Sequence, residues 1–140
     1  MIRPFKTEDL DDVMRIWLDT NVKTHEYIAE KYWMDNFAMV RKMIPNSEVY
    51  VFDDGLEIQA FVGIVNGYIA GIFVTESMQS KGIGKQLLEM CKEHYSKLTL
   101  NVYEKNQRAI SFYMREGFSV KGKQVDKKTG EAEMLLCWNR

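Results

Sequence analysis

Cysteine, proline and histidine are all scarce in this sequence, with two of each among 140 residues. Cys91 and Cys137 show no metal-ligand spacing such as C-x-x-C, so the sequence predicts no metal site. Cys91 falls on the apolar stripe of a predicted helix, and Cys137 lies in an apolar predicted strand. We therefore expect two buried free thiols, which suits a reducing compartment.

The sequence also lacks an excess of either charge. Its 19 basic and 20 acidic side chains leave a net charge of -1. Such a balance gives no general attraction to nucleic acid or to an anionic membrane, so neither is expected as a partner. Any anion site must be local, which points to a small ligand.

No apolar run is long enough to cross a membrane. The longest, "AFVGIVNGYIAGIFV", is interrupted by Asn66-Gly67 and is shorter than the about 20 residues that a spanning helix needs. The start, "MIRPFKTEDL", has no apolar core of signal-peptide length. We expect a cytoplasmic protein, and the length and the absence of linkers or repeats predict a single domain over residues 1–140.

Periodicity predicts most of the elements. Residues 2–5 can form a first strand, and two helical patterns follow, the first capped by Thr7 and the second ended by Pro45. Three predicted strands come next, "EVYVF", "EIQAFVGIV" and "YIAGIFV". The last two flank Asn66-Gly67, a strong hairpin signal because both residues tolerate positive φ.

A helical stripe begins at Ile83, and the strand "LTLNVY" follows it. Asn106 and Gly117 are expected to cap and to end another short helix, before two strands around "FSVKGKQV" and "EAEMLLCW". Antiparallel neighbours thus come first and a β-α-β crossover later. This order predicts an α/β fold with one mixed sheet and helices on both faces.

The stretch "QSKGIGK", residues 79–85, places two glycines where a strand gives way to a helix. Free backbone N–H groups and the helix dipole make such a place an anion site, suited to a phosphate or pyrophosphate. The dinucleotide fingerprint G-x-G-x-x-G needs a small residue where this chain has Leu87, and the phosphate-loop spacing of NTPases is also absent. The alternative is that Gly82 and Gly84 only permit a tight join.

The spacing Q-x-x-G-x-G, formed by Gln79, Gly82 and Gly84, follows "IFV" on a predicted strand and precedes "KQLL". It resembles the acetyl-coenzyme A loop, R/Q-x-x-G-x-G/A, of the GNAT N-acetyltransferase superfamily. The segment "NVYEKNQRAISFYMREGF" is similar to a later motif of that family, through Asn106, Ala109, Tyr113, Gly117 and Phe118. The order of predicted elements resembles the same fold from end to end.

The resemblance implies a GNAT fold, with a central mixed sheet of about seven strands and about four helices on both faces. It implies acetyl-CoA as the acetyl donor and no metal. In the family the pantetheine arm enters a gap in the sheet and pairs with strand backbone, here that of Ile72, Phe73 and Val74. The N–H groups of the loop would hold the pyrophosphate, and that loop consists of Gln79, Ser80, Lys81, Gly82, Ile83, Gly84 and Lys85.

The implied reaction transfers an acetyl group from acetyl-CoA to a primary amine by direct attack. The amine could be a lysine, an N-terminus or a small molecule. Tyr113 is the catalytic candidate, because a phenol with a pKa near 10 can protonate the leaving thiolate; a core tyrosine is the other interpretation. Asn106 would both cap its helix and make a polar contact to the pantetheine. The alternative is that it serves only as the helix cap.

The general base is where the sequence departs from many relatives, which carry glutamate at the position of Asn101. An amide takes no proton at neutral pH. Glu104, Glu76 and His25 are available substitutes, a water could relay the proton, or the acceptor could be a weakly basic amine. The departure leaves a second interpretation open: an acyl-CoA-binding sensor or regulatory module with weak or no transferase activity.

The acceptor side is expected around "NVKTHEYIAEKYW", which joins the first two helices and in the family lines the acceptor pocket. The candidates are His25, Tyr27 and Tyr68; for His25 a loop-fixing role is the alternative. This segment resembles a subgroup of small bacterial GNAT proteins that includes protein-lysine acetyltransferases. The resemblance leaves a monomer or a homodimer open.

Overall fold

The computed structural model describes all 140 residues. Its strands are β1 (Ile2–Pro4), β2 (Glu48–Asp53), β3 (Ile58–Val65), β4 (Tyr68–Val74), β5 (Lys97–Tyr103), β6 (Ser119–Val125) and β7 (Ala132–Asn139). Its α-helices are α1 (Leu10–Thr24), α2 (Glu30–Met43), α3 (Ile83–His94) and α4 (Gln107–Arg115). None of these helices combines the length and the apolar character that crossing a bilayer requires.

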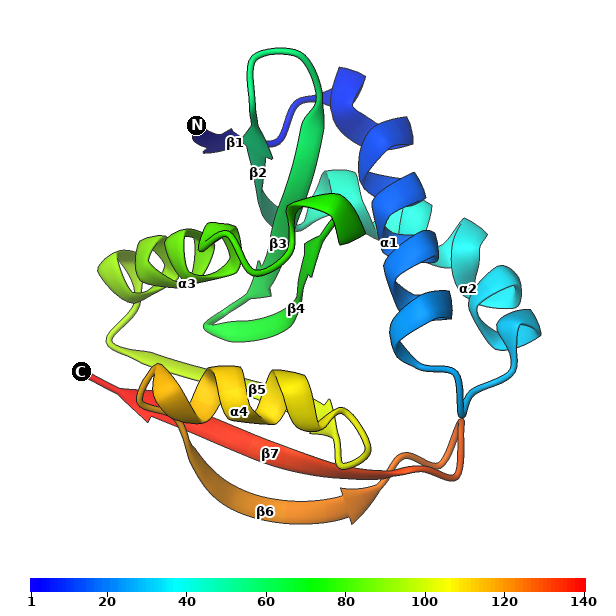
Figure 1. Cartoon of the computed structure of the whole chain (residues 1–140), viewed down its shortest axis with the longest axis vertical. Helices are drawn as coiled ribbons and strands as arrows, with labels where there is room; N and C mark the ends of the chain where they lie inside the picture. The colour runs from blue at the N-terminus through cyan, green and yellow to red at the C-terminus, as the bar shows by residue number, and fades with distance from the viewer.

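The strands form one sheet of seven in the order β1-β2-β3-β4-β5-β7-β6 (Figure 1). Strands β1 to β4 are antiparallel neighbours, and so are β5, β7 and β6. Between the two groups, α3 carries the chain from β4 to the parallel strand β5. The predicted mixed α/β sheet and the predicted order of elements are thereby confirmed.

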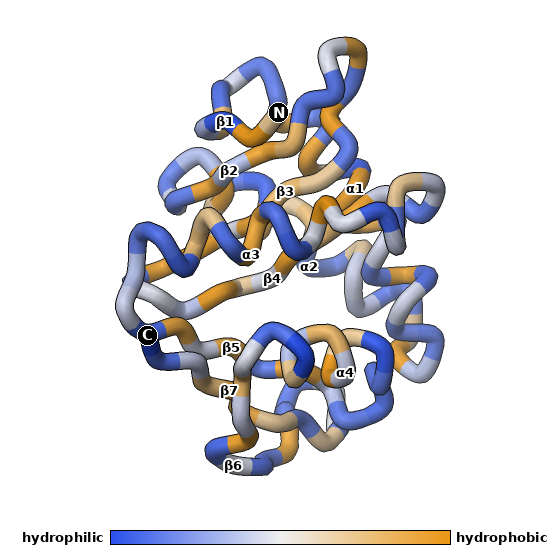
Figure 2. The backbone as a smooth tube through the Cα atoms, turned by 60° about the vertical axis from the view of Figure 1, so that its left-hand side comes forward, coloured by the Kyte–Doolittle hydropathy of each residue, from blue (hydrophilic) through white to orange (hydrophobic).

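Each face of the sheet has its own apolar core. One core, of 15 buried residues, joins α3 and α4 to the central strands, and another, of 11, joins α1 and α2 to β2 and β3. Strand β3 serves both, because its side chains alternate: Ala60 and Val62 belong to the first core and Phe61 to the second. In Figure 2 the central strands carry hydrophobic segments, and the helices alternate between hydrophobic and hydrophilic ones.

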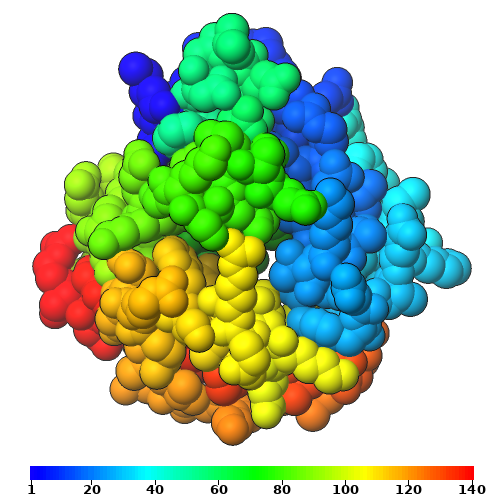
Figure 3. Space-filling model, in the orientation of Figure 1, coloured from blue at the N-terminus to red at the C-terminus, as the bar shows by residue number.

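Strands β4 and β5 part soon after they meet. The one pair of partner residues between them is Tyr68 and Thr99, and the rest of β4 pairs with β3 alone. A register shift between Gly63 and Ile64 of β3 leaves Ala70 as an extra residue of β4, a bulge of the kind that bends a strand. Figure 3 shows a narrow opening between the connection that follows β5, in yellow, and the end of α1, in blue.

The start of α1 differs from the prediction that Thr7 caps it. A 3-10 turn comes first, and Lys6 occupies the capping position. The Asp9 carboxylate accepts the Lys6 N–H at 2.8 Å and pairs with Arg3 of β1 at 2.8 Å. The Arg3 guanidinium lowers the pKa of the Asp9 carboxyl. A buried, paired carboxylate therefore fixes this helix where a threonine hydroxyl was expected to.

Other local predictions are confirmed. Asn66 (φ 51°) and Gly67 (φ 82°) form the turn of the β3–β4 hairpin. The Asn106 side chain caps α4, and Gly117 follows that helix with φ 96°. Both cysteines are free and buried.

Candidate active site

The loop between β4 and α3 presents a row of backbone N–H groups. Ser80 (φ 63°) and Gly82 (φ 84°) both adopt the left-handed conformation, and Gly82 is the N-cap of α3. The amides of residues 80–85 donate to no acceptor in the chain. Consecutive free amides at a helix N-terminus form a concave anion site, and the helix dipole adds partial positive charge there.

Side-chain hydrogen bonds hold this loop against its neighbours. Gln79 Nε2 donates to the Val74 carbonyl at 3.0 Å, which ties the loop to the end of β4. Arg108 of α4 donates through Nη1 to Gln79 Oε1 at 2.7 Å and through Nη2 to Ser80 Oγ at 2.8 Å. Sequence reasoning did not single out Arg108, because only the folded chain brings α4 beside this loop.

The beginning of α3 lies directly over the end of β4. A Cβ placed on Gly84 would lie 4.0 Å from side-chain atoms of both Ile72 and Val74, and 3.7 Å from Phe112. Lys81 and Lys85 are exposed on either side of the glycines and take part in no ion pair. The loop, the strand end and two free cations are thus brought together.

The strand residues expected to face the cofactor divide between the two cores. Ile72 and Val74 pack on the α3 side, whereas Phe73 stacks on Phe61 on the α1 side with ring centroids 4.8 Å apart. A Cβ on Gly71 would lie 2.4 Å from the Phe73 ring. Glycine is therefore needed at 71 because that ring covers it, and the bulge itself falls on the preceding residue.

Tyr113 of α4 is 7% exposed and packs edge-on against Phe112 and Phe118, with centroid distances of 5.0 and 5.4 Å. Its hydroxyl makes no hydrogen bond within the chain. Burial raises the pKa of Tyr113, so the phenol keeps its proton. The residue is thus part of the core and also carries an uncommitted proton donor.

Asn106 caps α4 as predicted. Its Oδ1 atom accepts the Ala109 N–H at 3.2 Å, and its own N–H donates to the Tyr103 carbonyl at 2.9 Å. The amide nitrogen of its side chain makes no hydrogen bond, so this group stays available at the end of β5.

Aromatic rings gather where α1 gives way to α2. The His25 ring stacks on Trp33 at 5.4 Å and meets Tyr27 and Tyr103 edge-on at 5.7 and 5.2 Å. Burial lowers the pKa of His25 to about 4, so the imidazole is neutral at pH 7. His25 Nδ1 and the Tyr27 hydroxyl are buried without hydrogen-bond partners. The structure thus brings two of the three predicted acceptor residues together and adds Tyr103.

The third predicted acceptor residue, Tyr68, lies on β4 beside Asn101 of β5. Asn101 Nδ2 donates to the Tyr68 hydroxyl at 3.1 Å. The Oδ1 atom of Asn101 is buried and has no partner. Burial raises the pKa of Tyr68, so its hydroxyl remains protonated. A buried acceptor and a hydroxyl therefore sit where the strands part.

Two carboxylates considered as a base are poorly placed for that role. Glu76 is 69% exposed and forms an ion pair with Lys23 at 2.7 Å. Glu104 is exposed on the turn after β5. His25 lies among the aromatic rings described above, but its pKa of about 4 makes it a weak base.

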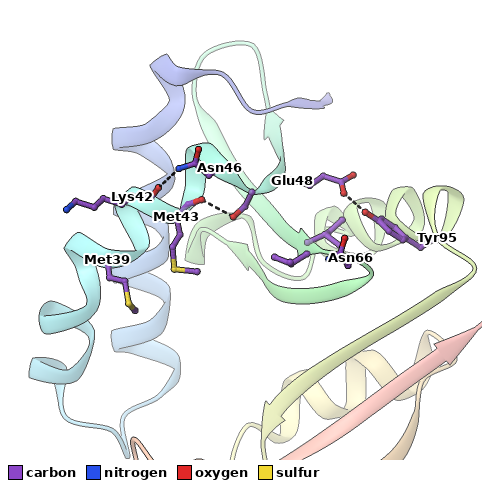
Figure 4. Close-up of a pocket in the computed structure, with 10 residues that line it drawn as sticks. Met39, Lys42, Met43, Asn46, Glu48, Asn66 and Tyr95 are labelled. Carbon is purple, nitrogen blue, oxygen red and sulfur yellow. Dashed lines mark hydrogen bonds between the residues drawn. The ribbon is translucent and has the colours of Figure 1, made fainter.

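A separate groove runs between the end of α2 and the β3–β4 hairpin (Figure 4). Met39, Met43 and Val65 line it, and Tyr95 donates a hydrogen bond to Glu48 at its edge. None of the residues expected at the active site lies among its lining residues. It therefore takes no part in the site described above.

Residues 20–130 match the family model described as an acetyltransferase (GNAT) domain. The chain belongs to the GNAT family. This GNAT chain is similar to the peptidyl-lysine N-acetyltransferase YiaC of Escherichia coli K12, with 30% identity over 140 residues, covering 99% of this chain and 96% of that one. Its identity to YjaB, a peptidyl-lysine N-acetyltransferase of the same organism, is 25% over 136 residues, covering 96% and 92%.

The solution structure of apo-form YjaB from Escherichia coli superposes on this chain with a TM-score of 0.87 and 24% identity, and covers 99% of this chain and 96% of that one. That agreement confirms the predicted GNAT fold. As a member of the family, the chain is an N-acetyltransferase that takes its acetyl group from acetyl-CoA and passes it to an amine.

Proposed function

We propose that this GNAT enzyme acetylates the side-chain amine of lysine in a peptide or protein. Two relatives, YiaC and YjaB, are named peptidyl-lysine N-acetyltransferases, and both matches run along nearly the whole chain. The observation that carries the proposal is the parting of β4 from β5 beside a cluster of aromatic rings. A long, flexible lysine side chain suits that approach.

The loop of residues 79–85 is proposed to hold the diphosphate of acetyl-CoA. Its free amides, the α3 dipole and the cations of Lys81 and Lys85 all favour a bound anion. The backbone of Ile72–Val74 has no strand partner on its β5 side, so it can pair with the amide groups of the pantetheine. Asn106 Nδ2 is free to add a polar contact. When bound, acetyl-CoA supplies an acetyl group activated as a thioester.

Tyr113 is proposed to protonate the departing thiolate. Its pKa is raised by burial, so the hydroxyl is a donor throughout the neutral range, and no group of the chain competes for its proton. Position matters as much as proton transfer, because fixing the two reactants side by side can account for about 7–11 kcal/mol of the barrier. The rigid packing of Tyr113 against Phe112 and Phe118 suits such positioning.

His25, Tyr27 and Tyr68 are proposed to line the path of the lysine. The neutral His25 does not repel a cation, and tyrosine rings attract one through their faces. Tyr27 already has such a neighbour, since Lys105 Nζ lies 5.2 Å from its ring centroid. These side chains therefore favour a cationic acceptor.

A thiol-release assay with four acceptors tests the proposal. The first is a peptide with a blocked N-terminus and one lysine; the second carries arginine in its place; the third has a free N-terminus and no lysine; the fourth is spermidine. We expect release, and mass-detected acetylation, to be at least about tenfold faster with the lysine peptide. Faster reaction of the third or fourth acceptor would overturn the lysine proposal while leaving acetyl transfer intact. Thiol release with none of them would favour the acyl-CoA-binding alternative.

We also propose a cytoplasmic, single-domain protein that is a monomer or a homodimer. The edge strand β6 carries Lys121 and Lys123 and a register shift, features that discourage edge-to-edge pairing and favour the monomer. Sedimentation velocity over a range of concentrations tests the oligomeric state.

A further inference from the structure

We infer that Glu133 of β7 is a catalytic carboxylate, which binds the ammonium group of the acceptor lysine and takes a proton from it. The inference rests on the proposed lysine acceptor. It places on β7 the task that Asn101 of the neighbouring strand β5 cannot perform, since an amide accepts no proton at neutral pH.

Strand register places Glu133 on the face of the sheet that carries the acceptor residues. Asn101 pairs with Leu135, and Tyr103 pairs with Glu133. Directly paired side chains of antiparallel strands share a face, and so do residues two apart on one strand. Diagonal neighbours such as Asn101 and Glu133 lie about 7–8 Å apart, and their Cβ atoms somewhat closer. The carboxylate of Glu133 can therefore reach the same region of this face as the side-chain amide of Asn101.

The carboxylate of Glu133 is half-buried and has no cationic partner in the chain. Gln124 Nε2 donates to its Oε1 at 2.7 Å, which orients the group and leaves Oε2 free. Burial is the main cause of the raised pKa of Tyr32 and of Tyr68; the charge of Glu133 adds to both, behind that of Asp126 in the case of Tyr32. Tyr32 belongs to α2 and Tyr68 to β4, so the charge of Glu133 acts on two elements that border the proposed lysine path.

The other carboxylates of the β6–β7 hairpin are committed elsewhere. Glu131 forms an ion pair with Lys105 at 3.1 Å. Asp126 accepts the Tyr103 hydroxyl at 2.7 Å and is tied into its own turn by the N–H of Lys128 at 3.0 Å. Glu133, in contrast, has no such partner in the chain. Its charge is therefore available to bind the ammonium group of a substrate.

The proposed chemistry balances as follows. The lysine ammonium gives one proton to the Glu133 carboxylate and becomes a neutral amine. Its nitrogen then forms a bond to the acetyl carbon while the carbon–sulfur bond breaks. The departing sulfur takes a proton from the Tyr113 hydroxyl, and the acylated nitrogen releases its second proton through water to the Tyr113 oxygen, which restores the phenol. The products are an acetylated lysine and free CoA thiol, and Glu133 returns its proton to solvent.

The test compares wild type with Glu133→Gln, using the blocked lysine peptide. We expect kcat/KM for the peptide to fall by about 100-fold or more, in the range usual for loss of a general base. Calorimetric affinity for acetyl-CoA should stay within about twofold, because the Glu133 side chain makes no hydrogen bond or ion pair with the 79–85 loop. The control is Glu89→Gln, which removes an exposed carboxylate of α3 whose partner is Lys92 at 3.9 Å, and it should stay within about threefold of wild type.

Two further measurements separate a base from a structural group. The double variant Asn101→Glu, Glu133→Gln returns a carboxylate to the same face and should recover at least about tenfold of the lost rate. Binding of the lysine peptide to CoA-saturated protein, measured by calorimetry, should weaken about tenfold in Glu133→Gln, because the ammonium loses its anionic partner.

Glu133→Gln activity within threefold of wild type would overturn the inference, as would a folded variant that loses rate but is not rescued by Asn101→Glu. Wild-type protein that releases no thiol with the lysine peptide would instead sink the proposed acceptor, and the role of Glu133 with it. The wild-type rate therefore distinguishes the two failures.

Discussion

Arg108 Nη1 donates to Gln79 Oε1 at 2.7 Å, and this contact links helix α4 to the proposed diphosphate loop. The same guanidinium holds the Ser80 hydroxyl at 2.8 Å. Ser80 adopts a left-handed conformation, which costs a non-glycine residue about 1–2 kcal/mol. The two hydrogen bonds help to offset that cost, so Arg108 keeps the loop amides pointing outward before any ligand arrives.

Replacing Arg108 with glutamine should therefore weaken the use of acetyl-CoA. We expect KM for acetyl-CoA to rise about 5- to 20-fold, which corresponds to about 1–2 kcal/mol of lost loop organisation. The value of kcat should stay within about twofold, since Arg108 does not touch the reacting atoms. Initial rates at saturating amine give both constants.

The matched control is Arg115→Gln, at the other end of α4, which should leave KM unchanged because that exposed side chain makes no hydrogen bond. Arg108→Lys should fall between wild type and Arg108→Gln, because one ammonium cannot serve Gln79 and Ser80 with the geometry of a guanidinium. An equal loss in kcat and no change in KM would contradict a role in shaping the loop.

The two loop glycines should respond differently to alanine. At Gly82 (φ 84°) a side chain has open space but an unfavourable backbone, so Gly82→Ala should lower stability by about 1 kcal/mol and weaken acetyl-CoA binding. At Gly84 a Cβ would make only ordinary contacts, at 3.7–4.0 Å, so Gly84→Ala should keep both stability and affinity. Thermal melts and calorimetry measure the two effects, and equal behaviour of the variants would contradict this distinction.

The order of elements along the chain and the strand-to-helix loop of residues 79–85 could be predicted from sequence because their signals are local. Glycines at a strand-to-helix join, the Asn66-Gly67 turn and alternating apolar residues each act within a few positions of the chain. The Thr7 cap was wrong because a distant residue, Arg3 of the edge strand β1, gives the Asp9 carboxylate a partner. Local propensity does not contain that contact.

The proposed site residues that the sequence did not reveal, Arg108 and Glu133, depend on neighbours that are far apart in sequence. Arg108 matters because α4 packs beside the loop, and Glu133 because β7 inserts next to β5. The pairing of Tyr103 with Glu133 joins residues 30 positions apart, separated in the chain by α4 and the β6–β7 hairpin. The hydrophobic pattern of β7 does not predict which of its side chains lie beside Asn101 and Tyr103. That follows only from the register between β5 and β7.

Removing the hydroxyl of Tyr113 tests its proposed role as proton donor. We expect Tyr113→Phe to lower kcat by about 100-fold while the affinity for acetyl-CoA stays within about threefold. The ring should keep its edge-on packing against Phe112 and Phe118, so the melting temperature should change little. Stopped assays with the lysine peptide measure kcat, and calorimetry measures binding. Unchanged kcat would leave Tyr113 as a core residue alone.

His25 should make the stability of the protein depend on pH. Burial lowers its pKa from 6.5 to about 4 in the folded chain. Above pH 6.5 the imidazole is neutral in both the folded and the unfolded state, so it contributes no pH dependence there. Between pH 6.5 and 4 the unfolded state binds the proton first, and the free energy of unfolding falls by up to about 3 kcal/mol.

Urea unfolding of wild type and His25→Phe at pH 7 and pH 4.5 measures this effect. Phenylalanine keeps a ring against Trp33 and cannot titrate, so the variant should lose about 2–3 kcal/mol less than wild type on acidification. The control is His94→Asn, which removes the other histidine of the chain and leaves the His25 ring in place. Equal acid sensitivity of wild type and His25→Phe would mean that His25 takes up a proton in the folded state, and a charged imidazole would then face the incoming lysine ammonium. The proposed lining of the lysine path by a neutral His25 beside Tyr27 and Tyr68 therefore depends on this one titration.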